Sequence, residues 1–349
     1  MSRPEPRFIV ARWALAVACC LGVVLFTIPG HLGLWRIYPF TQLSSMRMLT
    51  ALGILVGGLC CLGWAAWRRR GTLVRPSIVT ALVSIGCVGL VASLLLRDGA
   101  LRDEATADDA PDVTVLSFNA RDTDAEDIAE AVRETFADAV LLVEAPAEVV
   151  EGVAELLGED TVAHTNAEVV TSRFDAVGIV VHRRLGAYEP VEGPELQLGS
   201  LALTGGGHGP AHLTVVHPPP PVQRWAPAPR WSSQLATAVQ WCEDVGGIVG
   251  GDFNAVADHL GRSGLDECES ATDSLGLSAR GTWPVRLPGS LGAGIDHQLS
   301  RPDRWLPTRA KIVEIGDSDH RAVVVDYRRT GPERDDPDQA ETEPAEEQQ

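Results

Sequence analysis

Carboxylate, amide and imidazole side chains close several apolar runs of the sequence. Asn119 ends the run VLSF, Glu144 ends VLLV and His217 ends LTVV. Polar groups at strand ends that converge on one rim of a fold can build a single pocket. Carboxylate and amide oxygens suit Mg²⁺, and an Asp–His pair stabilises imidazolium, so this set could carry metal-assisted hydrolysis. The candidates are Asn119, Glu144, His217, Asp252, Asn254, Asp296, Asp319 and His320.

Spacing favours some of these groups acting together. Asp252 and Asn254 are two residues apart, so in an extended segment their side chains point the same way. Asp319 and His320 are adjacent, so a strand would aim them oppositely, whereas a turn over 316–318 would let both face inward. Taken singly, each cluster also has a plainer interpretation, as turn-forming or solvated polar residues.

Strand-like and helix-like patterns alternate between residues 113 and 328. Residues 128, 132 and 136 form an apolar stripe at helical spacing. Mixed connections with few strict βαβ units favour an α/β domain of two packed sheets with helices outside. We expect strands at 113–118, 139–143, 176–181, 213–216, 248–250, 295–299, 310–315 and 322–327, and helices at 124–136, 149–157 and 231–245.

Read in order, the polar motifs are F-N, V-E, V-H-P, G-G-D-F-N, G-I-D-H and S-D-H-R. This ordered set resembles the endonuclease/exonuclease/phosphatase superfamily, to which deoxyribonuclease I belongs, and the resemblance covers about residues 113–328. It implies a four-layer α/β/β/α sandwich. It also implies hydrolysis of a phosphate ester assisted by Mg²⁺, with Mn²⁺ as a possible substitute.

The resemblance further implies a role for each motif residue. Glu144 would be the main metal ligand, with Asn119 beside it and Asp319 at the metal side. Asp252 would orient or deprotonate the attacking water. The implied phosphate-facing groups are Asn254 on a phosphate oxygen, His217 toward the leaving group, and His320 with its ring held by Asp296.

Arg121 directly follows Asn119 and is a candidate contact for an anionic substrate. An exposed surface arginine is an equally good interpretation of it.

The front of the chain has the charge and hydropathy of a membrane region. Residues 1–97 hold ten arginines and one acidic residue, a charge of +9. The remainder carries −27, which gives the net charge of −18. Three apolar runs, at about 8–28, 48–67 and 77–96, are long enough to span a bilayer as helices. We expect the first to be a retained helix, although its basic start also fits a signal peptide.

The arginines also predict an orientation. They concentrate before the first run and between the second and third, which places those segments in the cytoplasm. The rest of the chain would then lie outside the cell membrane.

The remaining segments frame the domain. Residues 98–112 are polar and acidic, which indicates an exposed linker, and 329–349 are acidic without periodicity, which indicates a disordered tail. Of the seven cysteines, Cys242 and Cys268 follow the apolar runs and could pair outside the cytoplasm, but spacing does not decide whether they do.

The expected function is a membrane-anchored, metal-dependent phosphoesterase acting on a phosphodiester or phosphomonoester outside the membrane. Its substrate could be a lipid headgroup, a small molecule or a nucleic acid, although the −27 charge lacks the basic stripe typical of long nucleic acids. The alternative is a catalytically silent binding or scaffold domain on a membrane anchor. A transporter is disfavoured because the three runs contain no acidic residue.

Overall fold

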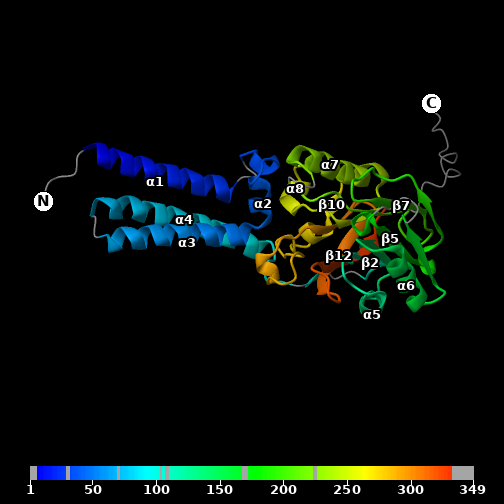
Figure 1. Ribbon diagram of the computed structural model, residues 1–349. Helices are drawn as coiled ribbons and strands as arrows, with labels where there is room; N and C mark the ends of the chain where they lie inside the picture. The colour runs from blue at the N-terminus through cyan, green and yellow to red at the C-terminus, as the bar shows by residue number, and fades with distance from the viewer. Residues whose placement is uncertain are drawn as a thin grey trace, which may run out of the picture.

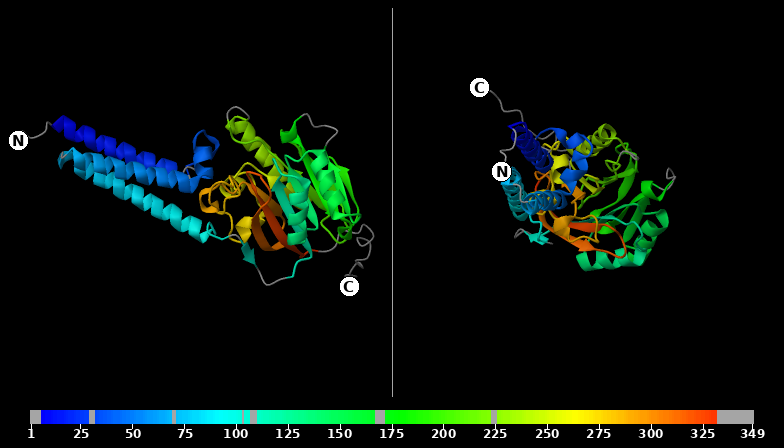
Figure 2. Two further views of the ribbon diagram at one scale, coloured as in Figure 1. Left: turned by 60° about the horizontal axis from the view of Figure 1, so that its bottom comes forward. Right: turned by 60° about the vertical axis from the view of Figure 1, so that its left-hand side comes forward.

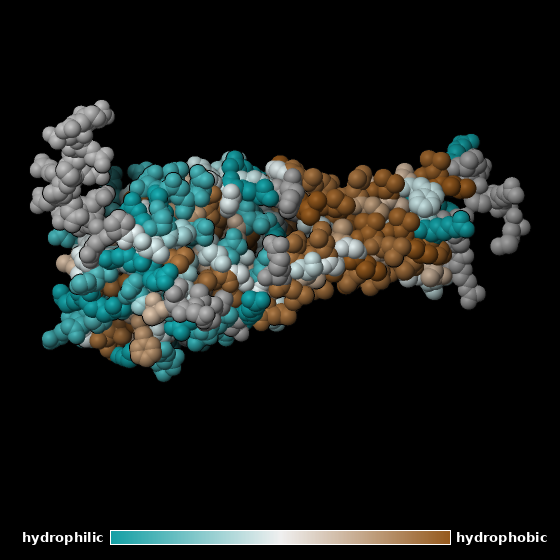
Figure 3. Space-filling view, turned by 180° about the vertical axis from the view of Figure 1, so that it is seen from behind, coloured by the Kyte–Doolittle hydropathy of each residue, from teal (hydrophilic) through white to brown (hydrophobic). Residues whose placement is uncertain are grey.

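Three long apolar helices form a stalk on one side of an α/β sandwich (Figure 1). This computed structural model describes residues 6–28, 32–68, 71–102, 104–106, 110–166, 172–222 and 226–331. The helices are α1 (Pro6–Thr27), α3 (Arg47–Trp67) and α4 (Gly71–Arg97). Each contains a segment long and apolar enough to cross a membrane: Arg7–Thr27, Arg47–Trp67 and Leu73–Leu96. Figure 3 shows the hydrophobic surface gathered on this stalk.

Two mixed sheets make up the sandwich, seven-stranded and six-stranded within the described ranges. The larger has the order β1 (Glu104–Thr106), β12 (Trp305–Glu314), β13 (Arg321–Arg329), β2 (Val113–Asn119), β3 (Ala139–Val143), β5 (Val177–His182), β4 (Thr161–Thr165). The smaller has the order β10 (Glu269–Ser270), β11 (Asp296–Ser300), β9 (Ile248–Asp252), β8 (His212–Val216), β7 (Ser200–Gly205), β6 (Tyr188–Val191).

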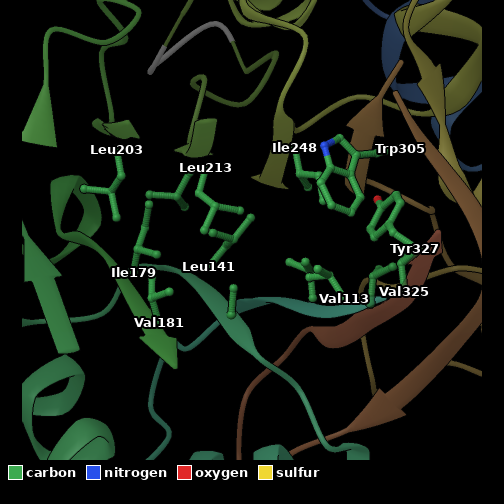
Figure 4. Packing of buried hydrophobic residues seen from close by; sticks show 14 of the residues in the cluster. Val113, Leu141, Ile179, Val181, Leu203, Leu213, Ile248, Trp305, Val325 and Tyr327 are labelled. Atoms are coloured by element: carbon green, nitrogen blue, oxygen red, sulfur yellow. The ribbon is translucent and has the colours of Figure 1, made fainter. Parts of the chain in front are cut away.

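Alternation along the strands separates the layers. In β2, Val113 and Val115 pack between the sheets, while Leu116 and Phe118 pack outward with side chains of α5 (Ala125–Thr135) and α6 (Ala147–Leu157). Figure 4 shows part of the cluster between the sheets. The outer face of the smaller sheet packs against α7 (Ala228–Val245). The predicted four-layer α/β/β/α sandwich is therefore confirmed.

The remaining described helices are short. They are α2 (Phe40–Ser45), α8 (Ala257–Leu260), α9 (Ala271–Ser274) and the 3-10 turns η1 (Leu34–Arg36), η3 (Arg173–Asp175), η4 (Arg183–Leu185) and η5 (Gly289–Leu291).

Two buried residues set how the sheets meet beneath the strand ends. A Cβ at Gly250 would lie 2.7 Å from Leu141 Cδ1, so the absence of a side chain allows β9 to approach β3 closely. Gln298 on β11 donates from Nε2 to Val115 O at 3.0 Å and Val323 O at 2.9 Å, across to the larger sheet. Its Oε1 accepts from the Tyr327 hydroxyl at 3.1 Å. Gln298 therefore joins the two sheets by buried hydrogen bonds.

Strand direction explains why the candidate residues share one rim. β2 runs parallel to β3, and β8 runs parallel to β9, so each pair ends at the same edge of its sheet. β13 is antiparallel to β2 and β11 is antiparallel to β9, so β13 and β11 begin where β2 and β9 end. In register, Asp296 at the start of β11 faces Asp252 at the end of β9.

The connection between the first two long helices is folded onto the sandwich. We call residues 32–46, which contain η1 and α2, the α1–α3 connection. Its Trp35 is buried in the same hydrophobic cluster as Trp231 and Leu235 of α7. Thr41 and Ser44 are also buried. Figure 1 shows α2 between the stalk and α8, and the views in Figure 2 show the stalk leaving from this side of the sandwich.

Several expectations differ in detail from the structure. Part of the expected linker, Glu104–Thr106, forms β1 and pairs with β12. Strands β4, β6, β7 and β10 were not predicted, although β7 contains the buried apolar residues Leu201 and Leu203. Arg329 ends β13, so the expected tail begins inside a strand, and its residues from 332 onward lie outside the described ranges. Cys242 and Cys268 form a disulfide, which the sequence left open.

Candidate active site

The strand-end side chains meet around one cavity of about 480 Å³ at the rim of the sandwich. Asn119 and Asp296 lie beneath it, buried, and reach its lining through hydrogen bonds. All nine residues predicted for the site therefore come together. Those that line the cavity directly are Arg121, Glu144, His217, Asp252, Asn254, Asp319 and His320.

Asn119 lies between two carboxylates. Its Nδ2 donates to Glu144 Oε1 at 3.1 Å and to Asp252 Oδ2 at 3.2 Å, while its Oδ1 accepts from the Arg121 amide at 3.2 Å. Burial raises the pKa of Glu144, and the Asn119 hydrogen bond partly opposes that change. Asn119 thus holds two carboxylates of the two sheets beside each other.

Two buried carboxylate oxygens at the cavity, Glu144 Oε2 and Asp319 Oδ1, have no hydrogen-bond partner among the described residues. Trp283 Nε1 donates to the other oxygen of Asp319 at 2.9 Å. Buried anionic oxygens without donors are costly, and a divalent cation is the kind of partner that would satisfy such oxygens. Hard oxygen ligands of this kind suit Mg²⁺ or Mn²⁺. The residues present therefore fit a metal at Glu144 and Asp319.

A second cluster joins Asp252, Asp296 and His320, whose ligand atoms lie within 4.8 Å of one another. The Nδ1 of His320 is 2.9 Å from Asp296 Oδ2, and its Nε2 is 3.7 Å from Asp252 Oδ2. Burial alone would lower the His320 pKa, but the Asp296 and Asp252 carboxylates outweigh it and raise that pKa to about 9. Burial, then Asp296, raises the pKa of Asp252. The cluster has ligand atoms close enough together for a metal ion, and its Asp296–His320 pair also favours a proton on the ring.

His217 faces the same carboxylates from β8. Its Nδ1 donates to Phe174 O at 3.1 Å, and its Nε2 lies 3.8 Å from Asp252 Oδ2 and 4.0 Å from Glu144 Oε1. Burial and the charge of His320 lower the pKa of His217 to about 4, so the ring is neutral at pH 7. One imidazolium and one neutral imidazole therefore face the cavity.

Backbone strain accompanies two site residues. Glu144 has φ of 52° and Asn254 has φ of 49°, in the left-handed region that non-glycine residues seldom adopt. Asn254 is held by its amide, which donates to Asp252 Oδ1 at 2.8 Å, and by Nδ2, which donates to Pro218 O at 3.0 Å. A tight turn after β9, and not the extended segment assumed from their spacing, places Asp252 and Asn254 on the same cavity.

Arg121 lies at the mouth of the cavity. Its guanidinium is 5.8 Å from the centre of the Phe174 ring, and its Nε is 3.4 Å from Asp122 Oδ2. The side chain is 44% exposed, so it could turn from Asp122 toward an anion without losing a buried contact.

The turn expected over 316–318 is present, and several residues that build the site had been given no role from the motifs. Ser318 accepts from the His320 amide at 3.0 Å and donates to Asn119 O at 2.7 Å, which fixes the turn before β13. That turn brings both Asp319 and His320 inward. Trp283 gives no chemical signal in the sequence. In G-I-D-H, Asp296 belongs to the site, whereas His297 is structural and binds Ala255 O at 2.8 Å.

Residues 116–320 match the Endonuclease/Exonuclease/phosphatase family. The chain belongs to this family. The matched range runs from Leu116 in β2 to His320 and so contains all nine residues predicted for the site. No curated protein sequence matches the chain significantly.

Solved structures similar to the chain include D. rerio TDP2 complexed with single strand DNA product, at 16% identity and a TM-score of 0.49, covering 62% of this chain and 98% of that one. The human Nocturnin catalytic domain with bound sulfate anion is 17% identical, with a TM-score of 0.48 and coverages of 66% and 97%. The Bacteroides thetaiotaomicron mannosyl-6-phosphatase Bt3783 is 15% identical, with a TM-score of 0.46 and coverages of 62% and 99%. Such low identities do not indicate a substrate for this chain.

Proposed function

We propose that the protein is a membrane-anchored phosphoesterase that uses Mg²⁺, or Mn²⁺ in its place, to hydrolyse a phosphodiester or phosphomonoester outside the cell membrane. The observation that carries this proposal is the pair of buried, unpartnered oxygens on Glu144 and Asp319 in the cavity that also holds Asp252 and His320. Family membership supports the same reaction class.

Glu144 and Asp319 would hold the metal, with Asn119 beside them. A bound divalent ion there would neutralise phosphate charge. The amide nitrogen of Asn119 donates to Glu144 at 3.1 Å and to Asp252 at 3.2 Å. Asn119 would therefore fix the metal-binding carboxylate relative to the carboxylate that activates water.

Asp252 would orient the attacking water and take its proton. Its raised pKa makes it a stronger base than an ordinary aspartate, and its Oδ1 is fixed by the Asn254 amide at 2.8 Å. Asn254 would hold a phosphate oxygen from the same turn, so water and phosphate would be positioned by residues two apart.

His320 would be the positive contact for the phosphate and a source of a proton. Asp296 fixes its ring through Nδ1, which leaves Nε2 toward the cavity. His217, held by Phe174 O, would face the phosphate and leaving group. Arg121 at the mouth would draw an anionic substrate inward.

The proposed location outside the membrane has two supports. Arginines concentrate at the N-terminal end, up to the first half of α1, and between α3 and α4. The Cys242–Cys268 disulfide is typical of compartments outside the reducing cytoplasm. External protease should therefore cut the C-terminal segment in intact cells; cleavage seen solely after lysis would contradict this orientation.

The activity test uses the full-length chain in detergent with bis-p-nitrophenyl phosphate and p-nitrophenyl phosphate. Hydrolysis should need Mg²⁺ or Mn²⁺ and stop with EDTA. Glu144→Ala, Asp252→Asn and His320→Ala should each lower kcat by roughly a hundredfold or more. His164→Gln, on β4 and away from the cavity, is the control and should keep normal activity. Undiminished hydrolysis by Glu144→Ala and His320→Ala would refute the site.

A further inference from the structure

One wall of the catalytic cavity comes from the membrane anchor. Gln42, Ser45 and Met46 of the α1–α3 connection line the same cavity as Glu144 and Asp252. Met46 directly precedes α3, whose membrane-length segment begins at Arg47. The cavity therefore lies next to the point where a membrane-length helix begins.

Specific contacts hold this wall in place. Gln42 Nε2 donates to Pro221 O, and Pro221 itself lines the cavity. Ser44 Oγ lies 2.9 Å from His259 Nε2 in a buried hydrogen bond. Arg47, the first residue of α3, forms an ion pair with Asp258. Since side chains on both sides of Ser45 and Met46 bind the sandwich, these two residues are fixed parts of the cavity.

Apolar atoms make up most of the surface that lines the cavity. Arg121 is the one arginine or lysine among the described residues around the cavity. Polynucleotides are held largely by many cationic contacts to phosphates, and such contacts are sparse here. An alkyl chain, by contrast, gains from leaving water for such a surface. The apolar residues that line the cavity are Met46, Phe174, Leu198, Pro220, Pro221, Val222, Trp283, Ala293 and Ile295.

We propose that the substrate is an amphiphilic phosphoester of the membrane, an inference that rests on the proposed function. Its apolar chain packs against the α1–α3 connection while its phosphate reaches Asp252 and His320. The phosphate of such a molecule sits at the membrane surface, next to its apolar chain. Met46 is then a specificity-determining residue: it contacts the chain and takes no part in the hydrolysis itself.

Two esters with the same p-nitrophenolate leaving group test this proposal: methyl p-nitrophenyl phosphate and hexyl p-nitrophenyl phosphate. Both are given with Mg²⁺ to the full-length protein in the same nanodiscs. Each buried methylene adds roughly fourfold in affinity, so kcat/KM should be at least tenfold higher for the hexyl ester. An unstructured single-stranded oligonucleotide is a third substrate and should be cleaved more slowly than the hexyl ester.

Variants locate the effect. Met46→Gln keeps side-chain length but removes apolar surface, and it should lower the ratio of kcat/KM for the hexyl ester to that for the methyl ester at least fivefold. Ser45→Phe adds bulk to the wall and should slow the hexyl ester more than the methyl ester. Ile37→Gln is the matched control, because Ile37 is a 51% exposed apolar residue of the same connection. It should keep the wild-type preference.

The outcomes separate the two proposals. If the wild type with Mg²⁺ or Mn²⁺ cleaves neither these three diesters nor the monoester p-nitrophenyl phosphate, the proposed function fails. If it cleaves both esters equally well, or the oligonucleotide fastest, the phosphoesterase stands and the amphiphilic substrate is refuted. If the hexyl preference exists but both Met46→Gln and Ser45→Phe retain it, the α1–α3 connection is not the selecting wall.

Discussion

Trp35 anchors the α1–α3 connection to the sandwich, and its truncation to alanine gives a sharp prediction. The side chain is 7% exposed. Its ring meets Trp231 edge-on at 5.9 Å between centroids and stacks on His259 at 5.9 Å. Thr41 Oγ1 also donates to Trp35 O at 2.8 Å, which links η1 to α2. Trp35→Ala removes the aromatic contacts and leaves the backbone link.

The expected loss in the free energy of unfolding follows from the area that the Trp35 side chain buries. A tryptophan buries about 200 Å², and at about 25 cal/mol per Å² this gives about 5 kcal/mol for a side chain so fully covered. Alanine retains part of this, and large-to-small changes of this kind cost about 3–5 kcal/mol. For a domain of this size the midpoint of thermal unfolding should fall by roughly 10 °C.

The assay is thermal unfolding of the full-length protein in detergent, followed by near-ultraviolet circular dichroism. Trp67→Ala is the matched control because Trp67 is 75% exposed at the end of α3, and it should shift the midpoint little. Hydrogen exchange at residues 41–46 should also quicken in Trp35→Ala. Equal midpoints and equal exchange in the two variants would refute the idea that the anchor is part of the folded sandwich.

Three further predictions concern stability. Gln298→Leu removes the hydrogen-bond partners of buried groups in both sheets and should lower the free energy of unfolding, measured with denaturant, by about 2–4 kcal/mol. A decrease below about 1 kcal/mol would contradict a stabilising role for these hydrogen bonds. Cys242→Ser opens a disulfide with a sequence separation of 26 and should cost roughly 3–4 kcal/mol, whereas unchanged stability under oxidising conditions would mean that the bond does not form. Burial lowers the pKa of His259 to about 3, so the unfolded chain binds a proton that the folded chain rejects. Stability should therefore be full above pH 6.5 and decline below it; relative to His259→Gln, the wild type should lose about 2 kcal/mol between pH 6.5 and 4.5, and parallel pH profiles would count against this.

The site could be predicted because its residues stand in short motifs at strand ends. Asn119, Glu144 and Asp252 each follow a run of buried residues, and sheet geometry then fixes where such runs finish. The long helices were equally clear, since their apolar lengths alone identify them. In both cases the deciding information is local in the sequence.

The features that could not be predicted from the sequence depend on contacts between segments far apart in the chain. Trp35 and Met46 stand between two membrane-length runs, where aromatic and apolar residues are expected at the membrane surface, so nothing local indicates that they pack on α7 and line the cavity. β6 has three exposed residues of four, and β1 has three residues in all, so neither shows the alternation of a half-buried strand. Pairing with a neighbouring strand, rather than side-chain pattern, defines them.

The central claim is that Glu144 and Asp319 share one divalent ion at the rim of the sandwich, and Mn²⁺ binding tests it without relying on turnover. Mn²⁺ is titrated into the full-length protein and free Mn²⁺ is followed by electron paramagnetic resonance. We predict that wild type and His164→Gln remove Mn²⁺ from solution and release it to excess Mg²⁺, and that Glu144→Gln with Asp319→Asn does not. Equal, Mg²⁺-sensitive binding in wild type and the double variant would contradict the account.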